Sequence, residues 1–234
     1  MILIASEMKT IFLIICLSIT VTSIANSQII KIDSSYAHAH YQQRLEFFEK
    51  MPNQKNEIVF LGNSIIEHGE WQELLAGVKA KVINGGIGGD NTFGVLARLD
   101  EVLVSKPQKI LLLIGINDLF RNLPCDVIIH NYKRILDRVK WESLGTKIYI
   151  HSILPINEEM TNQPYTVGRN TMVPLLNKLI RKLGGGEKIT YIDLHPLFID
   201  EKGMLKKEIS IHRVHLKASA YIDWVAYLKK MKYM

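Results

Sequence analysis

Short runs of apolar and β-branched residues alternate along this chain with longer amphipathic stretches. Five of these runs have the length and apolar continuity of strands that are covered on both faces. Alternation of this kind is typical of parallel βαβ units. It predicts a three-layer α/β/α sandwich whose five-stranded parallel sheet is formed by residues 57–61, 81–83, 109–114, 147–151 and 189–192.

The stretches between and around these runs have helical patterns and complete the predicted sandwich. A chain of 234 residues with 47% hydrophobic content can bury the core of one sizeable domain. The net charge of +6 comes from Lys and Arg residues scattered singly or in pairs, which argues against a nucleic-acid partner. The predicted helices cover 37–51, 71–75, 92–104, 127–141, 167–183 and 218–231.

The N-terminus has the pattern of an export signal. Lys9 precedes an apolar run at 11–21, and the small residues that follow suit cleavage after Ser27. Because the run is short for a permanent membrane span, we expect an exported protein, periplasmic or extracellular, without stable membrane insertion after cleavage. A membrane anchor is the alternative. The chain then divides into a signal peptide at 1–27, a helical lead-in at 28–55 and a main domain at 56–234.

Three motifs follow directly after predicted strands, where open parallel sheets bind their ligands. Ser64 at the start of a helical turn could act as a nucleophile or merely cap that turn. Four glycines within 85–89 could present backbone N–H groups to an anion or form a loop without a ligand. Asn117 could donate its side-chain amide to an oxyanion or serve as a turn residue.

A fourth candidate, His215, lies just before the last predicted helix and could return to the sheet edge near Ser64. Histidine titrates near neutrality, so it can accept a serine proton and later deliver it to a leaving alcohol. A lone histidine is more often structural. The order of serine, glycine loop, asparagine and histidine along the chain makes the combination more specific than any member.

These residues resemble the motif blocks of the SGNH hydrolases, also called the GDSL lipase/esterase family. The resemblance runs from residue 57 to the last helix and includes Asn63 where the family usually has Asp. The glycine loop and the segment 97–99 look most similar to the platelet-activating-factor acetylhydrolase-like subgroup. The resemblance implies a flavodoxin-like SGNH hydrolase fold, catalytic residues Ser64 and His215, and oxyanion donors at Ser64, Gly89 and Asn117.

The resemblance also implies the chemistry: an acyl-enzyme on Ser64, with His215 as the base. It implies a carboxylic-ester hydrolase for short acyl, acetyl-type esters that needs neither a metal ion nor an organic cofactor. Small-molecule or carbohydrate acyl esters are the expected substrates, and acetylated sugars suit an exported enzyme best.

A second position departs from the family pattern. His212 stands three residues before His215, where the family usually has an Asp that fixes the imidazole tautomer. A backbone carbonyl or a displaced acid such as Glu208 could orient His215 instead and leave a working esterase. The chain could also be a weakened esterase, or an inactive module that binds carbohydrate or lipid. Asp193 and His195 follow the last strand and are interpreted as loop-fixing groups.

Overall fold

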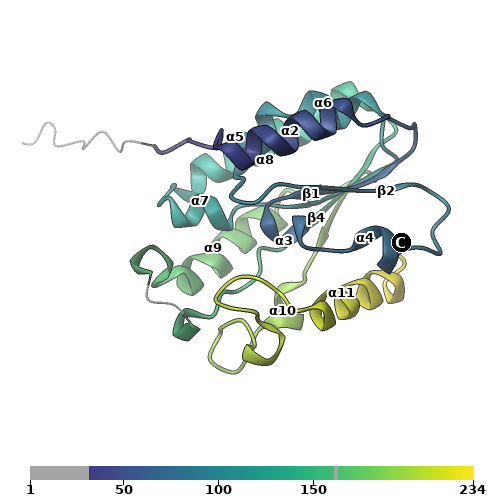
Figure 1. Ribbon diagram of the computed structural model, residues 1–234. Coiled ribbons are helices and arrows are strands. Elements are labelled where there is room, and N and C mark those ends of the chain that lie inside the picture. Colours follow the sequence, from purple (N-terminus) through teal and green to yellow (C-terminus); the bar gives the residue numbers. More distant parts are fainter. Residues whose placement is uncertain (1–31, 161–162) are drawn as a thin grey trace, which may run out of the picture. The chain divides into compact units, whose positions relative to one another are not determined.

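The central sheet has five strands, all parallel, in the order β2-β1-β3-β4-β5 (Figure 1). The computed structural model describes residues 32–160 and 163–234, so the predicted signal peptide lies outside the described residues. The predicted α/β sandwich with a five-stranded parallel sheet is confirmed, with strand ends shifted by up to three residues. The strands are β1 (Ile58–Gly62), β2 (Val82–Gly86), β3 (Lys109–Leu113), β4 (Lys147–His151) and β5 (Ile189–Ile192).

Helices cover both faces of this sheet. Figure 1 shows α2, α5, α6 and α8 above the sheet, and α3, α4 and α11 below it. The helix α9 follows β4 and packs against α7 and α8. The helices are α2 (Ala39–Lys50), α3 (Ser64–Glu67), α4 (Trp71–Leu74), α5 (Thr92–Ala97), α6 (Leu99–Val104), α7 (Ile116–Phe120), α8 (Cys125–Glu142), α9 (Arg169–Arg181), α10 (His195–Phe198) and α11 (Ala218–Lys230). Short 3₁₀ turns lie at Glu158–Met160, Pro164–Thr166 and Lys207–Ile209.

The helices differ from the sequence prediction at three places. The single helix predicted over 92–104 is interrupted at Arg98, whose backbone leaves helical geometry while its side chain turns into the protein. The helix α7 forms at Asn117, where a turn was the other interpretation of the sequence. The helix α10 begins at His195 and was not predicted.

A buried aromatic cluster supports the short helix α3, which carries Ser64. The ring of Phe60 on β1 stacks on Trp71 with centroids 4.0 Å apart, and Trp224 of α11 meets Trp71 edge-on. Trp71 Nε1 donates to the carbonyl of Ile66 at 2.8 Å, and Tyr221 Oη donates to the carbonyl of Ile65 at 2.7 Å. The C-terminal carbonyls of α3 are therefore held by core side chains, which fixes the position of its first residue.

Strand β2 lies at one edge of the sheet, and side chains cover its outward carbonyl groups. Gln72 donates to the Val82 carbonyl at 3.0 Å, and Arg44 of α2 donates to the carbonyls of Asn84 and Gly86. Covering an edge in this way removes a site for unwanted strand pairing. Among the helices of residues 32–160 and 163–234, none has the length and apolar character needed to cross a membrane.

Candidate active site

Ser64 is the first residue of α3 and follows β1 after a single intervening residue. Asn63 is the N-cap of this helix, because its Oδ1 accepts a hydrogen bond from the Ile65 N–H at 3.0 Å. The interpretation in which Ser64 merely caps the helix is therefore wrong. Gly62 is required at the turn, since a Cβ there would lie 2.1 Å from the Leu113 carbonyl oxygen. The Ser64 hydroxyl is left available for other contacts.

His215 meets Ser64 across 151 positions of sequence. Its Nε2 lies 2.8 Å from Ser64 Oγ, within hydrogen-bond range. The loop that carries His215 is closed on itself, because the Ile211 N–H donates to the His215 carbonyl at 2.9 Å. Leu216 and Ser210 also form an isolated antiparallel bridge at the base of this loop. The predicted nucleophile and the predicted base are thus brought together in the geometry that proton transfer needs.

The other ring nitrogen of His215 contacts His212. His215 Nδ1 and His212 Nε2 are 3.1 Å apart, and the two rings are nearly perpendicular. If Ser64 donates to His215 Nε2, the proton of His215 must be on Nδ1, and His212 Nε2 then accepts it as a neutral imidazole. The displaced acid considered from the sequence, Glu208, instead contributes its backbone carbonyl to a bond with Lys217. His212 occupies the orienting position itself.

The surroundings of His215 favour its neutral form. Burial, followed by the proximity of His68, His212 and Arg213, lowers the pKa of His215 to about 4. The His68 ring centroid lies 4.6 Å from that of His215, as does the centroid of His212. Positive charge on any of these neighbours opposes the imidazolium that a general base must become.

The glycine loop forms a tight turn beside Ser64. The Asp90 N–H donates to the Ile87 carbonyl at 3.1 Å, and Gly89 has a φ of +77°. Positive φ at the third position of a β-turn is the requirement of type II geometry, which favours glycine there. The Ile87 N–H donates to the Gly62 carbonyl at 3.0 Å, so the loop is tied to the strand that precedes Ser64.

Asn117 lies against the same loop. Its Nδ2 donates to the Asp90 carbonyl at 2.8 Å, which uses one of its two amide hydrogens and leaves the second for a ligand. The adjacent Asp118 is fully buried and accepts hydrogen bonds from the backbone and hydroxyl of Thr92. Burial raises the pKa of Asp118 to about 6, and these hydrogen bonds oppose the shift. The asparagine and glycine blocks are therefore joined into one unit.

A buried ion pair beneath the loop was not identified as a site feature from the sequence. Arg98 donates to Asp90 at 3.0 Å and also to the carbonyls of Gly62 and Gly85. Both charged side chains are inaccessible to solvent. Burial raises the pKa of Asp90 to about 6, and Arg98 works in the opposite direction. The only sequence signal was Arg98 within the segment 97–99, since a charge inside an apolar pattern needs a buried partner.

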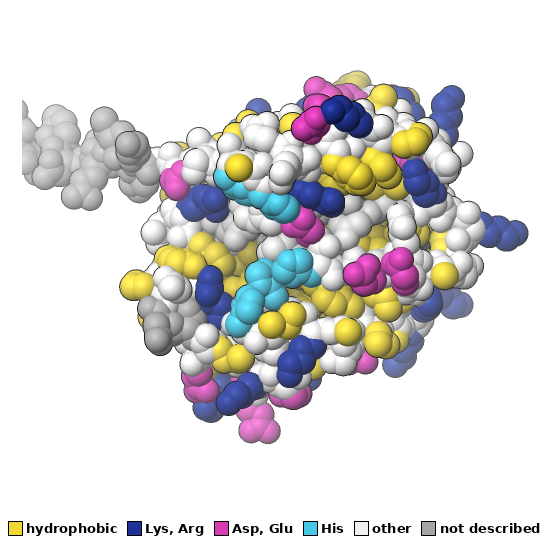
Figure 2. All heavy atoms as spheres, in the orientation of Figure 1, with side chains coloured by type: hydrophobic (Ala, Val, Ile, Leu, Met, Phe, Trp, Pro, Cys, Tyr) yellow, Lys and Arg dark blue, Asp and Glu magenta, His cyan; other side chains and the backbone are white. Residues whose placement is uncertain are grey.

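Two groups of histidines lie on one face of the molecule (Figure 2). One group is His68, His212 and His215; the other is His38 and His40 of the N-terminal segment, whose rings are stacked with centroids 6.3 Å apart.

Within the described ranges, no group of three or more His, Cys, Asp or Glu side chains is arranged to hold a metal ion.

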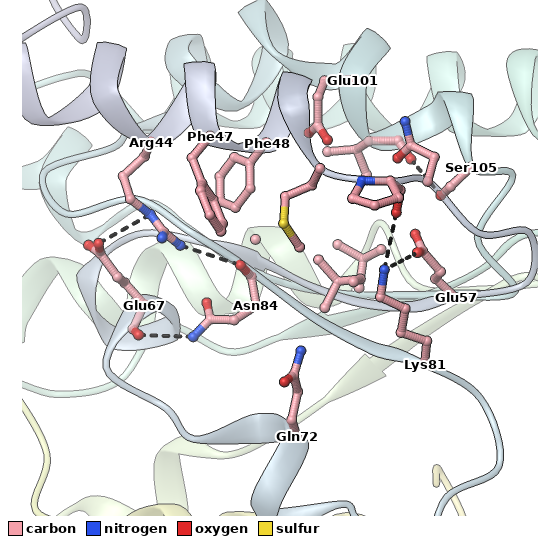
Figure 3. Close-up of a pocket in the computed structure, with 17 residues that line it drawn as sticks. Arg44, Phe47, Phe48, Glu57, Glu67, Gln72, Lys81, Asn84, Glu101 and Ser105 are labelled. Atoms are coloured by element: carbon pink, nitrogen blue, oxygen red, sulfur yellow. Dashed lines mark hydrogen bonds and ion pairs between the residues drawn. The ribbon is translucent and has the colours of Figure 1, made fainter.

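A cavity of about 510 Å³ lies away from the serine, between α2 and the edge strand β2 (Figure 3). Apolar residues including Phe47 and Phe48 line it from α2, and Arg44 and Glu67 stand at one end. Neither Ser64 nor His215 lines it. The candidate catalytic residues instead lie at the carboxyl edge of the sheet.

The family model for the GDSL-like lipase/acylhydrolase family matches residues 60–221, which include Ser64, Gly89, Asn117 and His215. The chain belongs to this family of carboxylic-ester hydrolases. The predicted resemblance to the SGNH hydrolases is thereby confirmed.

Two curated relatives of this GDSL-like protein are, by name, an acetylhydrolase subunit and an arylesterase. Human platelet-activating factor acetylhydrolase IB subunit alpha1 is 24% identical over 196 residues, which cover 81% of this chain and 79% of the relative. An arylesterase from Vibrio mimicus is 34% identical over 92 residues, but the match covers only 39% of this chain and 42% of that enzyme.

Solved structures share the fold. A Streptococcus pneumonia protein named for platelet activating factor superposes with a TM-score of 0.72 at 29% identity, covering 82% of this chain and 90% of that one. An acetylxylan esterase from Geobacillus stearothermophilus gives a TM-score of 0.59 at 17% identity, covering 76% and 95% of the two chains.

Proposed function

We propose that this protein is a serine esterase that hydrolyses short-chain, acetyl-type esters through an acyl-enzyme on Ser64. The observation that carries the proposal is the 2.8 Å contact between Ser64 Oγ and His215 Nε2 at the carboxyl edge of the sheet. A hydroxyl in contact with a neutral imidazole can lose its proton as it attacks a carbonyl carbon. Membership of an ester-hydrolase family supports the same chemistry.

In the proposed reaction, the bond from Ser64 Oγ to the acyl carbon forms while the hydroxyl proton passes to His215 Nε2. The tetrahedral intermediate then collapses, the bond to the leaving alcohol breaks, and that alcohol takes the proton from His215. Water attacks the acyl-enzyme in the second half, with His215 again accepting and returning one proton. The products are an alcohol and a carboxylic acid, and Ser64 regains its hydroxyl.

We assign the oxyanion to three donors: the backbone N–H groups of Ser64 and Gly89 and the second amide hydrogen of Asn117. Ser64 begins a helix, so its N–H has no partner in a preceding turn. The bond from Asn117 Nδ2 to the Asp90 carbonyl holds the amide beside the glycine loop. Preorganised donors of this kind stabilise charge that appears only in the transition state.

We assign His212 the orienting role that an Asp usually has. A neutral His212 accepting from His215 Nδ1 fixes the required tautomer, because His215 Nε2 is then left free to accept the serine proton. It provides no negative charge for the imidazolium, and the pKa of His215 is lowered to about 4. We therefore propose a working esterase whose base is weaker than that of a serine–histidine–aspartate enzyme.

For the substrate, we propose a small-molecule or carbohydrate ester carrying an acetyl group. Acetylxylan esterases among the structural neighbours and an acetylhydrolase among the relatives support an acetyl preference. We also propose that the predicted export signal directs the enzyme out of the cytoplasm, where acylated sugars and small esters would be its substrates.

The test measures release of nitrophenol from nitrophenyl esters of increasing acyl length. We expect the fastest turnover with acetate and a decline with longer chains. Ser64→Ala should lower kcat by about 10⁴-fold or more, because the nucleophile is lost. Equal rates for Ser64→Ala and the unmodified protein would refute the assignment of Ser64.

A binding module without turnover is the second candidate, and the observation that favours it is His212, in place of the usual Asp, beside His215 Nδ1. Isothermal titration with acetylated xylo-oligosaccharides separates the two. Binding without product formation, unchanged in Ser64→Ala, would support the module, whereas consumption of the acetyl ester would exclude it.

A further inference from the structure

The N-terminal segment that precedes the family match contacts the glycine loop directly. This segment, residues 33–50, lies outside the matched range 60–221. Asn91 Nδ2 donates to the Ser35 carbonyl at 2.8 Å, and Tyr41 Oη donates to the Gly94 carbonyl at 2.9 Å. A Cβ at Gly89 would lie 2.8 Å from His38 Nε2, so the His38 ring lies against the proposed oxyanion donor. The segment therefore packs on the loop and on the start of α5.

Glu67 connects this segment to the loop. It is the last residue of α3, one helical turn after Ser64, and its Oε2 accepts a hydrogen bond from the Gly88 N–H at 2.5 Å. From the other side, His40 Nε2 lies 2.8 Å from Glu67 Oε1 and Arg44 Nε lies 3.3 Å from it. Figure 3 shows Arg44 and Glu67 pointing toward each other.

The partners of Glu67 are fixed in turn. Arg44 also donates to the Gly86 carbonyl at 3.2 Å, and Asn84 Nδ2 donates to the Glu67 carbonyl at 2.9 Å (Figure 3). Gly86 allows α3 to approach this closely, since a Cβ there would lie 2.1 Å from the Glu67 backbone nitrogen. Asn84 thus holds the Glu67 main chain, while α2 and the glycine loop hold its carboxylate.

The bond to Gly88 holds the first corner of the turn that carries the proposed donor. Gly88 and Gly89 are the two central residues of the turn closed by the Asp90 N–H and the Ile87 carbonyl. The Gly89 N–H belongs to the central peptide of this turn, which points in opposite directions in type I and type II turns. The positive φ of Gly89 is that of the type II arrangement, and the Gly88 N–H, which belongs to the preceding peptide, ties the turn through Glu67 to α3 and so to Ser64.

We propose that Glu67 is a positioning residue that sets the Gly89 N–H for the oxyanion, and that α2 supports it through His40 and Arg44. This inference rests on the proposed function. Glu67 touches neither the nucleophile nor the base, so its effect on the reaction passes through the position of the glycine loop relative to α3. The N-terminal segment is consequently part of the active site.

Steady-state kinetics on nitrophenyl acetate test the inference with Glu67→Ala and Glu67→Gln. We expect Glu67→Ala to lower kcat about 10- to 100-fold with KM within about twofold, as misplacement of a group that stabilises only the transition state requires. Glu67→Gln keeps an amide oxygen that can accept from Gly88, so it should recover most of the loss. Glu73→Ala on α4, an exposed acid on the neighbouring helix, is the matched control and should leave kcat unchanged.

Amide hydrogen exchange at Gly88, measured by NMR on the ¹⁵N-labelled protein, gives a readout that does not depend on turnover. We expect exchange at Gly88 to be about tenfold or more faster in Glu67→Ala, with the thermal midpoint of Glu67→Gln close to that of the unmodified protein. Unchanged exchange, or a kcat within twofold of normal in Glu67→Ala, would overturn the inference. If the unmodified protein proved inactive, the proposed function would fail, and the exchange measurement alone would decide the role of Glu67.

Discussion

The two halves of the candidate site are built in different ways. The oxyanion half, which includes Gly89 and Asn117, lies on buried polar groups: Asp90, Arg98 and Asp118 are inaccessible or nearly so, and each is hydrogen bonded. The base half lies on a surface loop, where His212 is exposed and His215 is partly exposed. One half is therefore held by the core and the other by a few contacts near solvent.

This difference explains why the fold tolerates the departure at His212. Replacing one member of a buried polar network leaves its partner unpaired in a medium of low dielectric, which is costly. A hydrogen bond exposed to water contributes little to folding, because water can replace either partner. The exchange of the usual Asp for His212 therefore affects the chemistry of His215 without a large cost to the fold.

Removing the buried cation should give the largest effect on stability. Arg98→Met leaves Asp90 buried without its partner and also removes donors from two backbone carbonyls. We expect a loss of about 3–5 kcal/mol in the free energy of unfolding, measured by urea denaturation, as for other broken buried ion pairs.

The matched control for that change is Arg134→Met, since Arg134 is exposed on α8. It should alter the free energy of unfolding by less than about 0.5 kcal/mol. A similar free energy of unfolding for the two variants would show that the oxyanion half does not depend on its buried pair.

Loss of the side-chain donor should give the next largest effect, on turnover. Asn117→Ala removes the amide proposed to bind the oxyanion, and we expect kcat on nitrophenyl acetate to fall about 100- to 1000-fold. Asn117→Asp keeps the size of the side chain but replaces the donor with an acceptor, so its kcat should be at least as low. A threefold or smaller loss in Asn117→Ala would exclude Asn117 from the oxyanion site.

The fold and the candidate residues could largely be predicted from the sequence. Apolar runs and glycine-rich strand ends are local signals, so the five strands, Ser64, the glycine loop and Asn117 followed from the pattern. The choice of Gly89 within the loop came from the resemblance to the SGNH hydrolases. Whether these residues catalyse ester hydrolysis stays a prediction. The export signal also stays a prediction, since it lies outside the described residues.

The supporting contacts could not be predicted, because they join residues distant in sequence. Nothing local to Glu67 or Arg98 indicates that one meets Gly88 and the other Asp90. The interruption of the 92–104 helix has the same origin: Arg98 has ordinary helix propensity, and its tertiary partners determine its conformation. The contact between His212 and His215 likewise depends on the fold of their loop.

Restoring the usual acid should change only the base half, and it is expected to raise turnover instead of lowering it. In His212→Asp, a carboxylate beside His215 Nδ1 stabilises the imidazolium, so the pKa of His215 should rise from about 4. As the pH is lowered, His215 of this variant therefore becomes protonated, and is lost as a base, at a higher pH than in the unmodified protein. The acid limb, which is the fall of kcat/KM at low pH, should therefore move to higher pH. At pH 8, kcat should rise by at most about tenfold for each unit by which the pKa of His215 increases.

The pH profile of His212→Ala supplies the control for this change. It removes the acceptor on His215 Nδ1 without adding charge, so kcat should fall at pH 8 while the acid limb stays well below that of His212→Asp. If neither variant altered kcat or the limb, His212 would not orient His215. If His212→Ala had the kcat and pH profile of the unmodified protein and His212→Asp did not, the gain in His212→Asp would come from the added charge only. Ser64 and His215 would then operate as a pair without a third member.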